Sequence, residues 1–385
     1  MNILIENPYM EAGGAENRIK MLIEALLRRS DIGQVHFLVG GNMHVHNEQI
    51  DKKLHFWQTP KPSVTRLTEQ IINDYKIDVV QLHNNQYIGT AGIEKAQEMG
   101  IPTVWVMHDF WVLCWQRFLT KVWQATDYEN CYKIEPWKCI KCVNYYEYDL
   151  TRRQREVINK CDYGVVPSKR IAKIFEDNNV LNGKLKIIDP WIDLNVYHPL
   201  PVRKEMFQVF FAGNFIPHKG IQVLLKAWEL VNKRLPMAKL LAQGDERCFR
   251  ETLMMAKALK LQNVSFIKWV KPEELVRIYN ESAVTVFPST WEETAGLIWM
   301  ESLACGTPVL CSETGSIPEL LKYGGEMFPP RDHVALAEKI VDFLLSPSKM
   351  NKYAREGREY VNKNFHPDRG AYDFSKMYHE LEVKK

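Results

Sequence analysis

Short apolar runs alternate along this chain with longer stretches that carry apolar residues at helical spacing, and the alternation occurs in two consecutive series. This pattern is typical of an α/β protein with parallel sheets, in which connecting helices cover the faces of each sheet. The candidate strands of the first series are 3–6, 35–39, 78–82, 103–107 and 163–166, and those of the second are 209–212, 239–242, 264–267, 284–287 and 309–312. We therefore expect two doubly wound, Rossmann-like domains.

Pro199 and Pro201 lie among polar residues between the two series, which is typical of a linker. The chain of 385 residues also exceeds the roughly 250–300 residues that one hydrophobic core supports. The expected domains are 1–197 and 198–364. Ligands of such sheets bind at the carboxyl ends of the strands, so loops from both domains are expected to line an interdomain cleft.

Composition and charge exclude several classes of protein. The net charge of +3 is small for this length and gives no reason to expect nucleic-acid binding. No apolar run approaches the roughly 18 residues of a transmembrane helix. The first residues lack the basic start and the cleavage site of a signal peptide. We expect a cytoplasmic enzyme, and the scattered cysteines fit a reducing compartment.

The segment 287–308 carries the strongest chemical signal. A candidate strand ends, a loop with Glu292 and Glu293 follows, and a helix is expected to begin near Thr294. The unpaired backbone N–H groups of a helix start form a ready site for phosphate. Glu301 interrupts an otherwise apolar helix, and a carboxylate on a buried face is costly without partners. Residue chemistry alone leaves another interpretation open, in which the first two acids favour the first helical turn and the third caps neighbouring backbone.

The same segment resembles the signature of glycosyltransferase family 4, in which two glutamates eight positions apart precede an Ala-Cys-Gly-x-Pro-Val run. Glu293 and Glu301 match the pair, and 304–309 matches the run. The resemblance implies that Glu293 binds sugar hydroxyls and that Glu301 binds the nucleotide ribose. The family usually has glycine and an aromatic residue where this chain has Thr294 and Ala295, so the sugar-side loop is expected to differ in shape. The amides implied to hold the pyrophosphate are those of Ala295, Gly296 and Leu297.

A second match lies at 211–220, which resembles the family's strand–loop–helix segment that presents an arginine and a lysine to the donor diphosphate. Lys219 and Gly220 fit, whereas Asn214 stands where arginine is usual. Charge develops on the departing diphosphate as the glycosidic bond breaks, and preorganised cations and dipoles stabilise it. With an amide at 214, we expect that stabilisation to depend on Lys219 and the helix ends.

Three further matches are expected to complete the site. Gly13 and Gly14 resemble the family's N-terminal loop over the donor phosphate and the acceptor, because paired glycines allow close backbone approach. His108 matches the active-site histidine that contacts the donor sugar, and Gly244 resembles the loop beside the nucleotide base. Each has a structural alternative, since a Gly-Gly turn is most often only a loop and a lone histidine is more often structural than catalytic.

Four clustered cysteines lie in an insertion at about 111–148, and the last two form a C-x-x-C pair. They are Cys114, Cys131, Cys139 and Cys142. Four thiolates can hold a structural Zn²⁺ tetrahedrally. The alternative is a set of inert, part-buried thiols. A catalytic metal is not expected, because basic groups and helix ends can neutralise the diphosphate.

The same insertion is rich in aromatic and basic residues, among them Trp115, Trp137, Lys138, Tyr145 and Tyr146. Core packing accounts for such rings in many proteins. Aromatic faces also suit sugar rings, and rings beside basic side chains suit a membrane surface. Acceptor binding, or peripheral association with the inner face of a membrane, is therefore an alternative role.

The resemblance covers nearly the whole chain and implies a GT-B fold whose closing segment 365–385 crosses back to the first domain. It implies a retaining transferase that moves a hexose from a UDP-, GDP- or ADP-sugar to a glycan, lipid-linked or small-molecule acceptor, with no cofactor required for catalysis. In front-side attack the leaving phosphate takes the acceptor proton, so orientation and charge stabilisation suffice. The implied catalytic residues are His108, Lys219 and Glu293. A nucleotide-sugar epimerase or hydrolase, and a non-catalytic nucleotide- or glycan-binding protein, are the alternatives.

Overall fold

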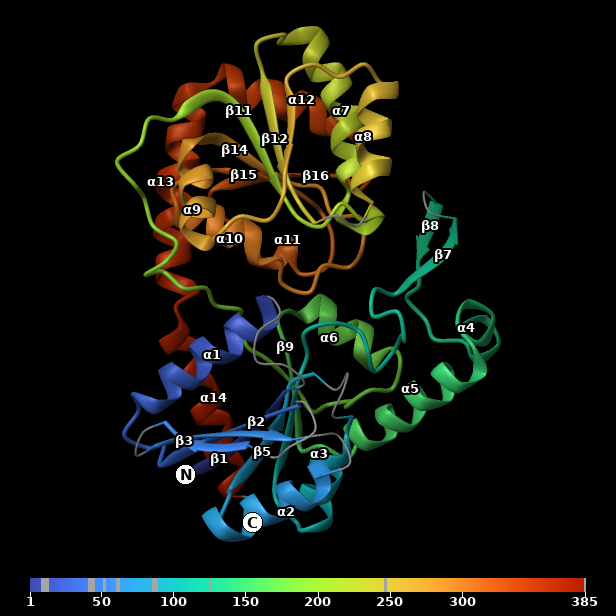
Figure 1. The fold of residues 1–385 in the computed structure, drawn as a ribbon, viewed down its shortest axis with the longest axis vertical. Helices are drawn as coiled ribbons and strands as arrows, with labels where there is room; N and C mark the ends of the chain where they lie inside the picture. The colour runs from blue at the N-terminus through green and yellow to red at the C-terminus, as the bar shows by residue number, and fades with distance from the viewer. Residues whose placement is uncertain are drawn as a thin grey trace. The chain divides into compact units, whose positions relative to one another are not determined.

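The computed structural model describes residues 1–7, 14–40, 46–50, 53–59, 63–84, 89–124, 127–245 and 248–383. Contacts divide the chain into two units: unit 1 comprises 1–122, 129–191 and 367–385, and unit 2 comprises 123–128 and 192–366. Each unit contains a mainly parallel sheet with connecting helices (Figure 1). The expected α/β class with two Rossmann-like domains is confirmed.

The sheet of unit 1 has eight strands within the described ranges, in the spatial order β10-β9-β6-β5-β1-β2-β4-β3. Neighbours pair in parallel, except that β3 is antiparallel to β4. Central β1 is a continuous apolar run at 3–5, because a parallel sheet is covered on both faces. The strands are β1 Asn2–Asn7, β2 Gln34–Gly40, β3 His46–Gln49, β4 Leu54–Thr59, β5 Val79–Leu82, β6 Thr103–Val106, β9 Tyr163–Val166 and β10 Leu185–Ile187.

Unit 1 is completed by the last helix of the chain. This helix, α14 (Pro367–Glu382), packs against α1 (Gly14–Leu27). Phe374, Met377 and Tyr378 of α14 join Ile19 and Leu22 of α1 in one buried cluster. The other helices of the unit are α2 Val64–Tyr75, α3 Ala91–Glu98, α4 Pro136–Cys142, α5 Tyr145–Ile158 and α6 Lys169–Glu176. A small hairpin consists of β7 Thr120–Gln124 and β8 Asp127–Asn130.

Unit 2 has a parallel six-stranded sheet in the part of the chain that is described, with the order β13-β12-β11-β14-β15-β16. Its strands are β11 Glu205–Ala212, β12 Lys239–Gln243, β13 Val264–Ile267, β14 Ser282–Phe287, β15 Val309–Ser312 and β16 Gly325–Phe328. Its helices are α7 Ile221–Arg234, α8 Phe249–Ala258, α9 Pro272–Glu281, α10 Leu297–Ala304, α11 Ile317–Leu320, α12 His333–Leu345 and α13 Pro347–Asn364.

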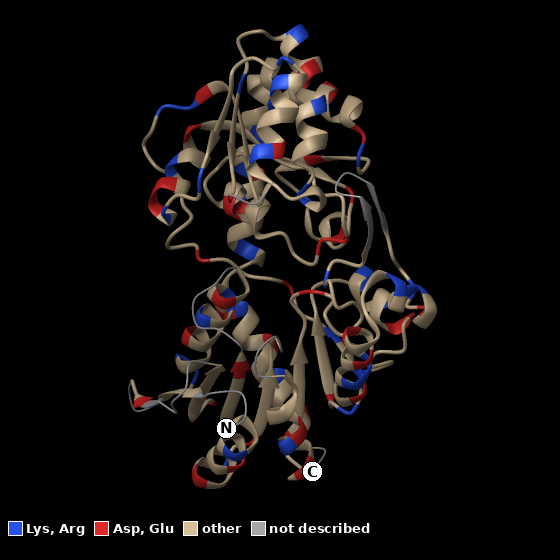
Figure 2. Cartoon of the chain, turned by 45° about the vertical axis from the view of Figure 1, so that its right-hand side comes forward, with Lys and Arg blue, Asp and Glu red and all other residues tan. Residues whose placement is uncertain are grey.

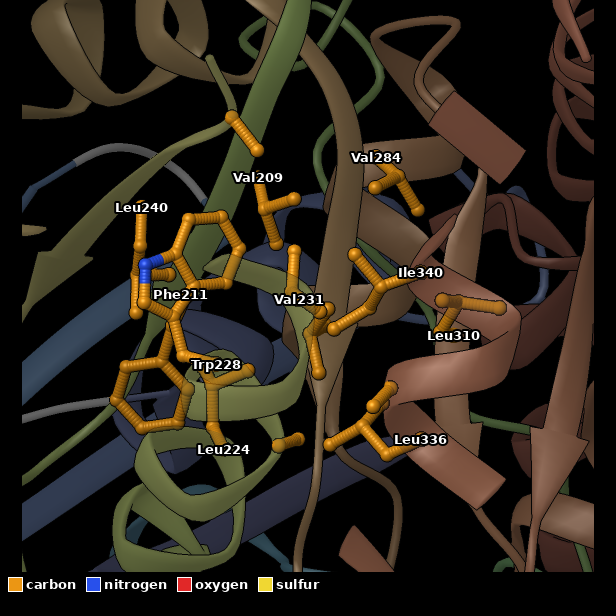
Figure 3. Close-up of a cluster of buried hydrophobic side chains, with 14 of the residues drawn as sticks. Val209, Phe211, Leu224, Trp228, Val231, Leu240, Val284, Leu310, Leu336 and Ile340 are labelled. Carbon is orange, nitrogen blue, oxygen red and sulfur yellow. The ribbon is translucent and has the colours of Figure 1, made fainter. Parts of the chain in front are cut away.

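The core of unit 2 lies between β-strands and the helices α7 and α12, as Figure 3 shows. Trp228 of α7 is fully buried in it, and its indole N–H donates to the Gln262 carbonyl at 3.1 Å. A buried indole needs such a partner, because an unpaired N–H would be costly. The side chains labelled in Figure 3 are Val209, Phe211, Leu224, Trp228, Val231, Leu240, Val284, Leu310, Leu336 and Ile340.

Basic and acidic residues are interspersed along the helices of each unit (Figure 2). Within the described ranges, no helix combines the length and the apolar character that crossing a membrane requires. The net charge of +3 is a small excess of basic over acidic residues in a chain that carries both signs throughout.

Candidate active site

The Glu293 carboxylate lies in the loop after β14 at the centre of a buried polar network. Its side chain is 3% exposed, and its Oε1 accepts three hydrogen bonds. Hydrogen bonds to an ionised group are shorter and stronger than neutral ones. No described residue donates to Oε2, so this oxygen can accept from a ligand hydroxyl. The donors to Oε1 are the Lys219 ammonium at 2.7 Å, the Trp291 indole N–H at 2.6 Å and the Ser289 hydroxyl at 2.5 Å.

Lys219 reaches Glu293 because the loops after β11 and β14 are packed closely together. Lys219 ends a 3₁₀ turn, and the next residue, Gly220, has a φ of 77°. A Cβ at 220 would lie 1.8 Å from the Pro288 carbonyl oxygen, so only glycine fits. The ammonium also lies 4.9 Å from the centre of the Trp291 ring, which fixes its position further.

A third loop, between β15 and α11, holds the backbone of Glu293. Gly315 has a φ of 54°, and a Cβ there would lie 2.0 Å from the Glu293 carbonyl oxygen. The Ser316 N–H donates to the same oxygen at 2.8 Å. Sequence reasoning missed Ser289, Trp291 and this glycine–serine pair, although a glycine shortly after a strand signals a close backbone approach.

Helix α10 begins at Leu297, so the predicted start near Thr294 was wrong. The cause is Gly296, whose φ of 65° lies outside the right-handed helical region, so a helix cannot run through this residue from Thr294. A Cβ there would also lie 2.9 Å from the Phe287 ring. The Leu297 amide therefore occupies the first helical position, while Thr294 and Ala295 are buried in the preceding loop.

Glu301 on α10 is held by phenols rather than by neighbouring backbone. The Tyr279 hydroxyl donates to its Oε2 at 2.9 Å, and the Tyr197 hydroxyl bonds to the same carboxyl group. Burial raises the pKa of Glu301 to about 7, against the opposing effect of both hydrogen bonds. The group is thus partly protonated near neutral pH, and it can both donate and accept hydrogen bonds there.

The loop after β12, which contains Gly244 and was predicted to lie beside the nucleotide base, packs directly on the loop after β11. A Cβ at Gly244 would lie 2.6 Å from the Gly213 carbonyl oxygen and 2.9 Å from the Phe215 ring. The Gly213 N–H in turn donates to the Gln243 carbonyl at 3.0 Å. Asn214 follows in a half-buried position. The glycine at 244 therefore has a packing requirement of its own, independent of any ligand.

In unit 1, polar side chains gather where the adjacent strands β5 and β6 end. His108 follows β6, and its Nε2 lies 2.8 Å from Nδ1 of His83, which follows β5. The two rings are stacked, with 5.1 Å between their centres. Burial lowers the pKa of His83 to about 3 and holds the pKa of His108 well below its usual value. Both rings are therefore neutral, at the end of the sheet where doubly wound folds bind ligands.

A chain of hydrogen bonds connects this histidine pair to α14. The Gln81 side-chain amide donates to Nε2 of His83 at 2.6 Å, and the Tyr378 hydroxyl donates to the Gln81 oxygen at 2.5 Å. Because Nε2 of His83 accepts, its proton is on Nδ1, which donates to Nε2 of His108. The proton of His108 is then on Nδ1. Sequence reasoning missed the other three members, since Gln81 and Tyr378 meet across 297 positions.

Asp109 lies next to this pair, while the two glycines predicted for the N-terminal loop are only partly described. Asp109 accepts from the Trp111 N–H at 2.9 Å and faces Arg117 at 3.4 Å. Burial raises the pKa of Asp109 to about 6. Gly14 is the exposed first residue of α1. Gly13 lies outside the described residues.

One small pocket in unit 1 is lined by four thiols, those of Cys114, Cys131, Cys139 and Cys142. Burial raises the pKa of Cys114 to about 11 and also raises that of Cys139. Among the residues that the structure describes, no three His, Cys, Asp or Glu side chains are arranged to hold a metal ion. The thiols as they stand do not fit a zinc site, and zinc binding stays a prediction. Elemental analysis of purified protein tests it, since about one zinc per chain is required.

Two family descriptions match consecutive parts of the chain. Residues 12–196 match glycosyltransferase family 4, and residues 198–360 match glycosyl transferases group 1. The first range contains the histidine pair, and the second contains the Glu293 network. The chain belongs to glycosyltransferase family 4. This family 4 protein is accordingly a transferase enzyme.

Individual relatives of this family 4 glycosyltransferase are distant. It is 27% identical to spore coat protein SA of Bacillus subtilis over 221 residues, which cover 51% of this chain and 59% of that protein. It is 22% identical to the alpha-monoglucosyldiacylglycerol synthase of Streptococcus pneumoniae over 81% of this chain and 67% of that protein. The chain thus spans less than two thirds of the first of these relatives.

Solved structures confirm the GT-B fold of this family 4 enzyme. Sucrose-phosphate synthase from Thermosynechococcus elongatus superposes with a TM-score of 0.78 over all of both chains, at 18% identity. Anabaena HepE, solved in complex with UDP-glucose, superposes with a TM-score of 0.72 over all of both chains, at 17% identity.

Proposed function

We propose that this transferase moves a hexose-type sugar, with retention of configuration, from a nucleotide-diphosphate sugar to a glycan, lipid-linked or small-molecule acceptor. The proposal depends on one observation: the contact of Lys219 with Glu293 places a cation beside a carboxylate whose Oε2 can accept from a ligand. The complex of Anabaena HepE with UDP-glucose supports a nucleotide-sugar donor in a protein of this fold.

In the proposed reaction, the donor diphosphate competes with Glu293 for the Lys219 ammonium. The bond between sugar C1 and the departing phosphate oxygen breaks, and the acceptor oxygen bonds to C1 on the same face. The acceptor proton passes to the departing phosphate oxygen, so no protein nucleophile is needed. Lys219 and the amides before α10 stabilise the developing charge. Glu293 orients sugar hydroxyls, Glu301 contacts the ribose, and His108 contacts the sugar.

The donor is tested by thermal shift with UDP-, GDP- and ADP-sugars, because a ligand that binds only the native state raises the melting temperature. Lys219→Met should then weaken binding of the matching nucleoside diphosphate about 10- to 100-fold, through loss of a charged hydrogen bond, and nucleoside binding little. Lys226→Met, on an exposed position of α7, is the matched control. Equal losses for diphosphate and nucleoside contradict the phosphate contact.

The alternatives are separated by turnover. A hydrolase or epimerase consumes the donor at the same rate with and without acceptor, and a non-catalytic protein binds nucleotide without turnover. Retention is read from the anomeric configuration of the first product formed, measured by NMR before mutarotation. An inverted product contradicts the front-side mechanism.

We further propose that the acceptor is lipid-linked. The enzyme, which is otherwise cytoplasmic, would meet this acceptor at an anionic surface on the inner face of a membrane. Trp137, Tyr145 and Tyr146 are 59%, 66% and 70% exposed. Lys138 and Lys141 lie over the Trp137 ring, at 5.0 and 5.5 Å from its centre, and basic residues lie on α4 in Figure 2. Exposed rings beside lysines suit the boundary between anionic headgroups and acyl chains. The pneumococcal relative is named for a lipid product, which supports the same acceptor class.

Vesicle flotation tests the membrane contact. The protein should float with phosphatidylglycerol-containing vesicles, and Trp137→Ser should reduce that fraction severalfold. Trp269→Ser removes a ring of unit 2 that is 50% exposed and should leave flotation unchanged. Equal behaviour of the two variants contradicts the assignment of this surface.

A further inference from the structure

Arg18 on α1 is a buried cation without a counter-ion in the described chain. The residue is 9% exposed. Its Nε is buried and has no hydrogen-bond partner, and no described carboxylate pairs with the guanidinium. Charged side chains are rarely buried unless they are paired, because the lost hydration costs several kcal/mol. An arginine that is buried and unpaired within the described ranges is a candidate to bind an anionic group of a ligand.

Among the described residues, the guanidinium packs on an aromatic ring. Its central carbon lies 4.6 Å from the centre of the Trp191 ring. A cation–π contact of this kind stabilises by about 2 kcal/mol when desolvated, which offsets only part of the cost of burial. Burial lowers the pKa of Arg18 to about 10, with no carboxylate acting in the opposite direction. The guanidinium is therefore still charged at neutral pH.

The described surroundings of Arg18 supply no compensating negative charge. Its charge acts on His83 and His108 and lowers the pKa of both rings, so it is within electrostatic reach of the histidine pair. Both rings are neutral and supply no negative charge. The pair marks the ends of β5 and β6, where ligands of doubly wound sheets bind. The uncompensated cation thus lies near the ligand-binding end of the sheet of unit 1.

We propose that Arg18 binds an anionic oxygen group, a phosphate or a carboxylate, carried by a substrate of this transferase. The guanidinium offers a planar fork of N–H donors that matches such a group. Two sources share this chemistry: the diphosphate of the donor, and a phosphate or carboxylate of the acceptor. The inference depends on the proposed function only for the identity of the substrate, since the site itself can be tested without turnover.

The first experiment compares thermal shifts in sodium phosphate and in sodium chloride at equal ionic strength. Phosphate should raise the melting temperature of the wild type and of Arg66→Met, an exposed control on α2. The phosphate-induced shift should be smaller in Arg18→Met. The methionine keeps the apolar stem against Trp191, and loss of an uncompensated charge should leave the variant at least as stable as the wild type in chloride. An undiminished phosphate shift in Arg18→Met overturns the proposal.

The second experiment identifies the source of the anion. If Arg18 binds the donor, Arg18→Met should weaken binding of the nucleoside diphosphate (UDP, GDP or ADP) that stabilises the wild type about 10- to 100-fold and leave binding of the matching nucleoside unchanged. If it binds the acceptor, the affinity for that diphosphate is unchanged, and the Arg18-dependent phosphate shift persists when that diphosphate is saturating. Absence of both effects overturns the proposal. A transferase assay that fails with every donor contradicts the proposed function and leaves the phosphate result intact.

Discussion

At the scale of single residues, Glu293 and Glu301 show how two carboxylates in one short segment acquire different properties. Glu293 is paired with an ammonium and two further donors on one oxygen. Glu301 is paired with two phenols, and burial raises its pKa to about 7. Pairs of acids whose environments differ in this way usually have different roles. The first suits a fixed acceptor for sugar hydroxyls, and the second suits a group that exchanges protons near neutral pH.

Glu293→Gln keeps the shape of the side chain and removes its charge. We expect the rate of transfer to fall about 100- to 1,000-fold, as for loss of a transition-state contact, with little change in melting temperature. Glu293→Ala leaves Lys219, Trp291 and Ser289 without their shared acceptor, which should cost about 1–3 kcal/mol in addition. Initial rates and calorimetry check both effects. Glu313→Gln, an exposed acid nearby, is the control, and an unaffected rate in Glu293→Gln would refute the role.

Glu301 gives a pH dependence with a definite sign. Its pKa rises from 4.5 to about 7 on folding, so between these values the native state holds a proton that the unfolded chain releases. The contribution of Glu301 to stability is therefore fully present below pH 4.5 and is lost as pH rises through about 7. Glu301→Gln should remove up to about 3 kcal/mol of that fall. Glu6 has the same shift, so part of the slope remains. Urea unfolding from pH 4.5 to 7.5 measures both curves, and parallel curves contradict the assignment.

At the scale of elements, close contact between loops sets the donor site. Gly220→Ala would place a Cβ 1.8 Å from the Pro288 carbonyl oxygen, and it would force apart the loops after β11 and β14. We expect loss of diphosphate binding together with destabilisation well beyond the cost of a left-handed residue. Gly306→Ala is the control, because Gly306 has a φ of 73° and its nearest neighbouring atom is at 4.0 Å. That variant should lose only about 1–2 kcal/mol. Similar effects of the two variants would contradict the loop contact.

The hydrogen-bond chain from α14 to the histidine pair is tested at its far end. Tyr378→Phe removes the donor to Gln81, so the amide no longer has a fixed orientation and the tautomer of His108 is no longer determined. We expect a change in the ¹⁵N resonances of the two histidine rings, and a lower kcat with little change in KM. Tyr372→Phe, on the same helix and 56% exposed, should change neither. Unaltered ring resonances in Tyr378→Phe rule out this positioning role.

Helices and strands can be predicted from the sequence where a pattern within a few neighbouring residues determines them. Strands such as β1 and β14 are buried along most of their length and are rich in apolar residues, because both faces of a parallel sheet are covered. Short edge strands such as β3 and β10 have no such pattern and were not predicted. The spacing of Glu293 and Glu301 is visible in the sequence, but Ser316 and Tyr197 reach them through tertiary packing alone. The start of α10 was predicted three residues early, because the left-handed conformation of Gly296 and its close approach to the Phe287 ring are visible only in the folded chain.

At the scale of the whole molecule, unit 1 depends on residues from both ends of the chain. α14 contributes Phe374, Met377 and Tyr378 to the core that contains Ile19 and Leu22. A chain that ends at His366 should therefore lose the cooperative unfolding of unit 1 and expose apolar surface. A chain that ends at Glu382 should behave as the wild type. Circular dichroism and dye binding measure the difference, and a native-like truncation at His366 would contradict the role of α14.

This arrangement has a consequence for synthesis on the ribosome. The main stretch of unit 2, residues 192–366, is continuous and emerges before α14 does. Domains generally fold as units while the chain is made, the N-terminal one first. Here the order is reversed, since the face of α1 that α14 covers stays open to water until the final segment leaves the exit tunnel. We therefore expect unit 1 to be completed after unit 2 and to leave the apolar face of α1 uncovered during that interval.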